Sequence, residues 1–128
     1  MRRYLLVALL AAACTDQGDG SIDYRVIGSF VTTHPAGLHI EPDGHATQTK
    51  PDGTFALVLD ATMLQQLDNA VNAADLPTHV EYTGCCDFPD DQVVVNRDGA
   101  RTLVVNRNAK DVPPARLALV QLLQHLNQ

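Results

Sequence analysis

Two copies of one turn signal, Glu41-Pro42-Asp43-Gly44 and Lys50-Pro51-Asp52-Gly53, constrain the fold of this chain more than any other feature. Proline fixes φ at the second residue of a turn, and glycine accepts the positive φ that the exit of the turn needs. Segments with alternating polar and apolar residues flank both turns, at 38–40, 45–49 and 55–59. Such alternation is typical of half-buried strands. The sequence therefore predicts a β-meander.

A strand and a helix are predicted on either side of this meander. Residues 22–30 alternate as a strand does, and Pro35 places residues 32–37 in a loop because proline cannot donate to a central ladder. Asp60 is expected to cap a helix that ends at Leu76-Pro77. One face of this helix is apolar and carries Leu64, Leu67, Val71 and Ala74. Residues 78–91 are expected to form a loop.

A hairpin and a second helix complete the prediction. The segments 92–96 and 101–105 flank Arg97-Asp98-Gly99-Ala100, which is a strong hairpin signal. Val112-Pro113-Pro114 opens the last helix, because proline is favoured in a first turn. Its residues expected to face the sheet are Leu119, Leu122, Leu123 and Leu126, assisted by Leu117 and Val120. The predicted fold class is α+β: a mostly antiparallel sheet with two helices packed on one face.

The first residues of the chain have the pattern of a bacterial lipoprotein signal. Arg2-Arg3 precede an apolar run, and three small residues then lead to Cys14, an order that is typical of a secretory signal and resembles a lipobox. In lipoproteins the signal is removed before the cysteine, which then carries lipid. The ten apolar residues 4–13 would cover about half of a bilayer core, so they are too short for a membrane span.

These signals predict three parts: a signal peptide at 1–13, a lipidated Cys14 with a flexible tether at 14–21, and one domain at 22–128. Removal of the signal takes away Arg2 and Arg3 and leaves 7 basic residues against 15 acidic ones, a net charge of −8. Such a chain offers no electrostatic footprint for nucleic acid. The expected location is the cell envelope, with the outer membrane favoured in a host with two membranes, since Thr15 replaces aspartate after the cysteine.

Cys85 and Cys86 are the remaining cysteines, and they are adjacent. Neighbouring Cα atoms lie about 3.8 Å apart, below the usual disulfide range of about 4.4–6.8 Å. A bond between them would therefore be strained and easy to reduce. We expect this pair to fix a loop, as a vicinal disulfide or as two thiols. A redox or metal-responsive role is the alternative.

No motif for catalysis or for a resident cofactor is evident. Asp87, Asp90 and Asp91 follow the cysteines without the order of an EF-hand loop, so a solvated acidic loop is expected. His39 and His45 could face each other across a turn and hold a divalent cation weakly. Neither serine lies in a nucleophile motif. We expect a protein that is not an enzyme and has no cofactor.

The order of features over residues 22–127 resembles the emfourin-like domains, small bacterial proteins whose named member inhibits a thermolysin-like metalloprotease, protealysin. The resemblance rests on Gly28-Ser29-Phe30-Val31, on residues 64–77, on Cys85-Cys86-Asp87, and on the end of the chain from Val112 to Asn127. It implies an α+β fold, and Gly28, Ser29, Phe30 and Val31 as residues that contact a protease.

Together these patterns predict a lipid-anchored, non-enzymatic binding protein of the bacterial cell envelope. The most specific version of this hypothesis is an inhibitor of a thermolysin-like metalloprotease, in which a rigid loop at residues 28–35 enters the protease cleft. The alternative is a structural envelope lipoprotein without a protease target, or the metal- or redox-responsive module with Cys85 and Cys86. The expected partners are the membrane, through the lipid, and a secreted or envelope metalloprotease.

Overall fold

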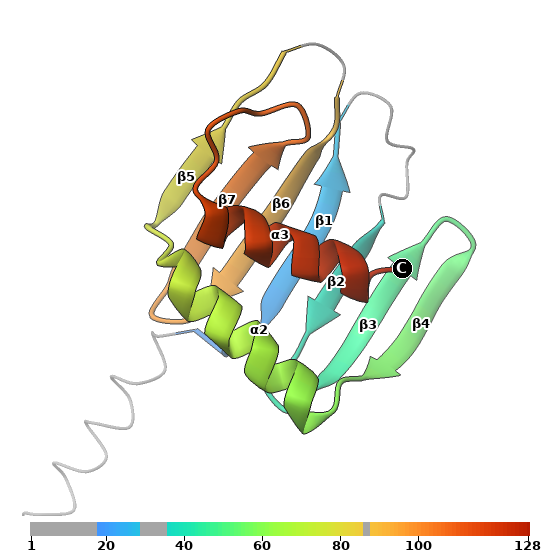
Figure 1. Cartoon of the computed structure of the whole chain (residues 1–128). Helices are drawn as coiled ribbons and strands as arrows, with labels where there is room; N and C mark the ends of the chain where they lie inside the picture. The colour runs from blue at the N-terminus through green and yellow to red at the C-terminus, as the bar shows by residue number, and fades with distance from the viewer. Residues whose placement is uncertain (1–17, 29–35, 86–87) are drawn as a thin grey trace, which may run out of the picture.

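The computed structural model describes residues 18–28, 36–85 and 88–128, which form one seven-stranded sheet and two helices (Figure 1). The strands lie in the order β4-β3-β2-β1-β6-β7-β5. Their bounds are Ile22–Ile27 (β1), Gly37–Ile40 (β2), His45–Lys50 (β3), Gly53–Val58 (β4), His79–Tyr82 (β5), Asp90–Asn96 (β6) and Ala100–Asn106 (β7). The helices are α2, Ala61–Ala74, and α3, Pro114–Leu126.

Neighbouring strands are antiparallel except for one pair, and the predicted α+β fold class is confirmed. The meander β1–β4 follows the two predicted turns, and β6 and β7 form the predicted hairpin. The exception is β5, which pairs in parallel with β7 at the edge of the sheet. The prediction of a loop over 78–91 is therefore wrong for His79–Tyr82 and for the start of β6.

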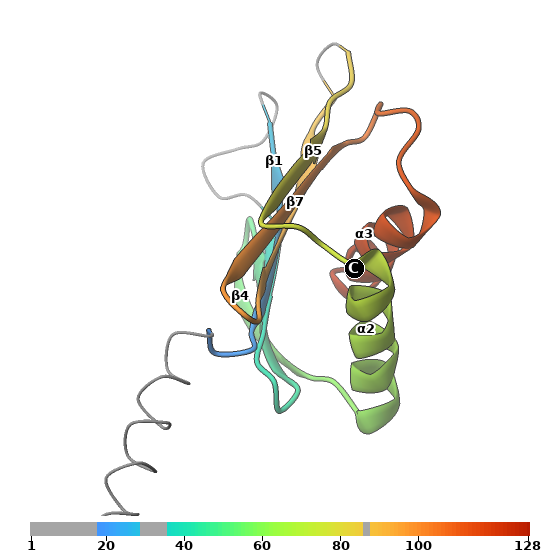
Figure 2. The ribbon, with the colours of Figure 1, turned by 90° about the vertical axis from the view of Figure 1, so that its left-hand side faces the viewer.

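Both helices cover the same face of the sheet, as the side view shows (Figure 2). The apolar residues that alternate along the inner strands point to this helix face, and they bury against α2 and α3. The core from the sheet includes Ile22, Tyr24, Leu38, Ile40, Val93, Val95, Leu103 and Val105. The other face, which we call the open face, carries no helix in the part of the chain that the structure describes.

The helices bury the stripes that the sequence indicates, with one exception. Asp60 caps α2 by accepting a hydrogen bond from the backbone N–H of Met63 at 2.8 Å, as expected. In α3 the side chains of Leu119, Val120 and Leu123 are buried. The exception is Leu117, which was expected to assist this stripe: its side chain is 37% exposed, and it lines a groove between α3 and the sheet and is not part of the core.

The domain begins before residue 22. Ser21 is 1% exposed, and its backbone C=O accepts a hydrogen bond from the N–H of Asn96. The N–H of Gly20 donates to the C=O of Asn96 at 2.8 Å. Residues 18–21, which we expected in the tether, thus belong to the fold, where Gly20 and Ser21 extend the pairing of β1 with β6. All core residues in the described part of the chain lie after Gly18, so a chain that starts at Thr15 contains every described strand and helix.

Candidate functional site

The sheet has two ends with different connections (Figure 1). We call the end at which β1 stops, at Ile27, and β6 starts, at Asp90, the loop end. The connections between β1 and β2, β5 and β6, and β7 and α3 leave from it. The opposite end, where Gly18 lies against Asn96, is the tether end. The first described residue and the long connections are therefore at opposite ends of the strands.

A buried carboxylate, Asp91, ties the loop end together. Asp91 is 1% exposed and accepts a hydrogen bond from the Tyr24 hydroxyl, 2.6 Å away. Arg107 donates to both of its oxygens, from Nε and Nη2, each at 3.1 Å. Gln124 of α3 donates from Nε2 at 3.0 Å. One carboxylate thus joins β1, β6, the residue after β7 and α3.

The electrostatics of this cluster favour a charged pair with a neutral tyrosine. Burial, together with hydrogen bonding to Asp91, raises the pKa of the Tyr24 phenol, so its proton stays in the bond. The hydrogen bonds to Asp91 raise the pKa of the Arg107 guanidinium. A buried carboxylate with four donors is satisfied, and it resists displacement because each partner would lose its bond. The cluster therefore stiffens the loop end.

A groove of about 790 Å³ lies above this cluster, between α3 and the loop end of the sheet. Its apolar lining comes from Val26, Ala36, Val112 and Val120, and its polar lining includes Arg107. The Arg107 side chain is 41% exposed, so its guanidinium is accessible from solvent beside the groove. A groove with apolar walls and one accessible cation suits a peptide or a small ligand.

Asparagine side chains fasten the loops to the end of β7. Asn106 donates to the C=O of Phe88 at 3.0 Å and to Asp90 Oδ1 at 2.9 Å. The N–H of Arg107 donates to the C=O of Pro89. Asn108 donates from Nδ2 to Cys85 Sγ at 2.9 Å. The connection before β6 is thereby held against the connection after β7.

The residues predicted as sites are described only in part. Gly28 lies at the loop end, close to Pro89, with φ of +150°. Cys85 is exposed at the same end. Ser29, Phe30, Val31, Cys86 and Cys14 lie outside the described residues. The predicted protease contact and the cysteine pair therefore start from one end of the sheet, while their own geometry stays a prediction.

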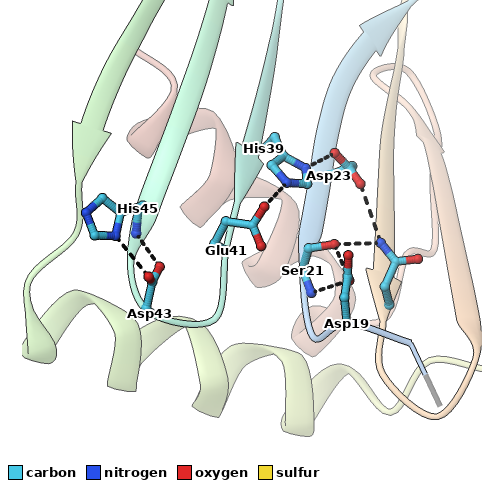
Figure 3. Close-up of polar contacts among 8 residues, drawn as sticks. Asp19, Ser21, Asp23, His39, Glu41, Asp43 and His45 are labelled. Carbon is cyan, nitrogen blue, oxygen red and sulfur yellow. Dashed lines mark hydrogen bonds and ion pairs between the residues drawn. The ribbon is translucent and has the colours of Figure 1, made fainter. Parts of the chain in front are cut away.

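A second polar cluster lies on the open face near the tether end (Figure 3). His39 is held between two carboxylates: its Nδ1 is 2.6 Å from Asp23 Oδ1, and its Nε2 is 2.7 Å from Glu41 Oε1. Hydrogen bonding to both carboxylates raises the pKa of His39. Ser21 and Asn96 border the same shallow pocket. The imidazole is therefore saturated by its neighbours.

The structure corrects two interpretations of these side chains. His39 and His45 do not face each other, because the His45 ring pairs with Asp43, with Nδ1 3.0 Å from Oδ2 (Figure 3). Asp91 is buried on the helix face and is not part of a solvated acidic loop, because it shares the alternation of Val93 in β6. Within the described ranges, no three His, Cys, Asp or Glu side chains gather as a metal site requires.

Sequence reasoning missed the Asp91 cluster, although one signal for it was present. Asp91, Val93 and Val95 stand two residues apart, so they occupy the same face of a strand. The partners Tyr24, Arg107 and Gln124 lie 67, 16 and 33 residues from Asp91 and carry no local signal.

Comparison of the chain with models of known protein families and with the sequences of curated proteins finds no match. Among the residues that the structure describes, no helix has the length and apolar character to cross a membrane.

Proposed function

We propose that this chain is a non-enzymatic binding protein that lipid on Cys14 holds at the bacterial cell envelope. The partner that we propose is a thermolysin-like metalloprotease, which the chain would inhibit. The observation that carries the proposal is the opposite placement of Gly18 and the loop end, because a chain anchored before Gly18 presents the loop end away from its anchor. Binding residues are commonly found on loops that a rigid scaffold positions.

The Asp91 cluster supports a binding role for the loop end. Loops that are ordered before binding lose less conformational entropy when a partner binds. Tyr24 and Arg107 fix the ends of β1 and β7 on Asp91, and Asn106 fixes the residues before β6. The segment 28–35 follows β1 in the sequence, and its first residue, Gly28, lies beside Pro89 at the loop end. In our proposal Gly28, Ser29, Phe30 and Val31 contact the protease.

The polar clusters also favour binding over catalysis. Both ring nitrogens of His39 have carboxylate partners, and all four donors around Asp91 are engaged with it. A nucleophile or a general base must instead be free to reach a substrate.

Inhibition is tested with the chain from Thr15 onward and a panel of secreted thermolysin-like proteases. Cleavage of a fluorogenic peptide is followed with the chain at micromolar concentration. We expect one or more proteases to slow, and a Phe30→Ala variant to relieve the inhibition. Val58→Ala is the matched control, because Val58 is a 72% exposed apolar residue at the tether end of β4. Unchanged rates across the panel would refute the inhibitor and leave the anchor untouched.

The anchor has a separate test in cells. Cells that express the chain are grown with labelled palmitate, and their membranes are fractionated. The wild-type chain should carry the label and be found in the membrane fraction, in the outer membrane if the host has two membranes. Cys14→Ala should abolish the label and either release the chain or leave its signal uncleaved. Normal processing and retention of Cys14→Ala would contradict the lipobox.

A further inference from the structure

The two edges of the sheet differ in their protection. β5 forms one edge, is only four residues long, and carries His79 and Glu81 toward the open face. β4 forms the other edge, is six residues long, and has no charged residue between Gly53 and Val58. An uncharged, exposed edge strand presents unpaired N–H and C=O groups that can pair with another strand. Only the β5 edge has the short length and the charge that commonly prevent such pairing.

The helical layer covers little of β4, in which Leu57 is the one described residue that packs partly against the core. At the last covered strand, β3, Gln48 is 3% exposed and donates to the C=O of Asn127 at the end of α3, 2.5 Å away. In β4, one strand further out, Phe55 is 43% and Val58 is 72% exposed. Figure 1 shows β4 at the margin of the sheet, beyond both helices. Lys50 of β3 extends over this strand, with its Nζ 5.7 Å from the Phe55 ring centroid.

We propose that β4 pairs with β4 of a second copy of this chain, antiparallel about a two-fold axis. The other described edge is short and charged, so the uncharged, apolar strand that complements β4 best is β4 itself. A two-fold interface uses the same surface on both copies, and an uncharged strand can meet itself without repulsion. The pairing makes one continuous sheet from two.

The register follows from the hairpin. The two-residue turn pairs Lys50 with Gly53, and the N–H of Leu59 still bonds back to Gly44 at 2.9 Å. Hydrogen-bonded and non-bonded residues alternate along an antiparallel ladder. The even-numbered residues Thr54, Ala56 and Val58 therefore direct their backbone groups outward. Centring the two-fold axis on Ala56 pairs Thr54 with Val58 of the second copy.

The same register matches the side chains on both faces. Phe55 lies opposite Leu57 of the second copy on the helix face, an aromatic–aliphatic pair of the kind that stabilises sheets. Beyond the strand, Asp52 would lie opposite Asp60 of the second copy, so repulsion limits the pairing to residues 53–59. The helices of both copies stay on one face. Gly18 lies by the open-face pocket with Asp23 and His39, so both tethers leave from the open face.

Sedimentation of the chain from Thr15 onward tests the dimer. We expect a concentration-dependent dimer, and at least about tenfold weaker association in Ala56→Lys, which places two like charges opposite each other. His79→Lys is the matched control, because it adds the same charge at the exposed β5 edge, and it should associate as the wild type does. A monomer up to millimolar concentration, or equal effects of the two lysines, would overturn the proposal.

A cross-link keeps the proposal testable if Ala56→Lys fails to fold. In a background without Cys85 and Cys86, Ala56→Cys places two thiols in a pair whose Cα atoms lie about 5.5 Å apart, within disulfide range. Oxidation with diamide should give a covalent dimer that reductant reverses. His79→Cys should stay monomeric. Equal cross-linking of both variants, or none in Ala56→Cys, would contradict the two-fold pairing.

Discussion

Replacement of Asp91 by asparagine should be among the most destabilising changes of near-equal volume in this protein. The carboxylate accepts four hydrogen bonds, from the Tyr24 hydroxyl, two Arg107 nitrogens and Gln124. Asparagine offers one acceptor oxygen with two lone pairs, and its NH₂ group must face a donor. At least two donors would therefore lose their partner.

The magnitude follows from burial. An unsatisfied buried donor costs about 1–3 kcal/mol, and breaking a fully buried ion pair costs about 3–5 kcal/mol. Water can solvate Arg107, because its side chain is 41% exposed, so the loss should fall below the upper limit. We expect Asp91→Asn to lower the free energy of unfolding by about 3 kcal/mol, or the Tm by roughly 10 °C. Tyr24→Phe removes one bond to a charged acceptor and should cost about 1.5–3 kcal/mol.

Urea unfolding of the chain from Thr15 onward, followed by circular dichroism, measures these losses. Asp52→Asn is the matched control, because Asp52 is exposed in the β3–β4 turn and should change stability by about 0.5 kcal/mol or less. The double variant of Tyr24 and Asp91 should lose less than the sum of the single losses, since both changes remove one shared bond. If Asp91→Asn lowers the free energy of unfolding no more than Asp52→Asn does, the Asp91 cluster does not stabilise the loop end.

Three further predictions follow from other contacts. The pKa of His39, measured by NMR, should lie above 6.5. Its contribution to the free energy of unfolding should be present below pH 6.5 and disappear as the pH rises through the raised pKa. A dependence of stability on pH that His39→Gln leaves unchanged would contradict this. Arg116→Ala should cost about 2 kcal/mol in urea unfolding, because Arg116 donates to two carbonyls at the end of α2 and to a tyrosine hydroxyl of β5. Gly44→Ala should lower the free energy of unfolding more than Gly99→Ala, again in urea unfolding. Both residues have positive φ, but a Cβ added at Gly44 would lie 2.7 Å from the backbone oxygen of Leu59, whereas a Cβ at Gly99 would meet nothing within 4 Å.

Local patterns were sufficient to predict most of the fold. The turns at Pro42 and Pro51 fix where the meander reverses, and the Asp60 cap fixes the start of α2. β5 was missed because it is four residues long and half-exposed, and because its partner β7 comes about twenty residues later in the chain. An edge strand with one neighbour needs little apolar sequence, so its pattern is weak.

For the candidate site, the sequence indicated individual residues but not the contacts that they make. It pointed to the segment that starts at Gly28 and to the cysteine pair, and the structure places Gly28 and Cys85 themselves at the loop end. The alternation of Asp91 with Val93 and Val95 was the one signal that Asp91 is buried, and nothing in the sequence indicated its three partners, since Tyr24, for example, lies 67 residues away. The possibility of a weak metal site between His39 and His45 is also wrong, because each ring is paired with its own carboxylates.

The sequence by itself determined the turns of this protein and its described elements except β5, because alternation, proline, glycine and caps act over a few residues; the anchor stays a prediction. Only the tertiary structure decided the order of the strands, the tie at Asp91 and the unprotected edge at β4. These depend on contacts between residues far apart in the chain. Packing of the whole sheet against its helices selects such contacts, and no short stretch of sequence encodes them.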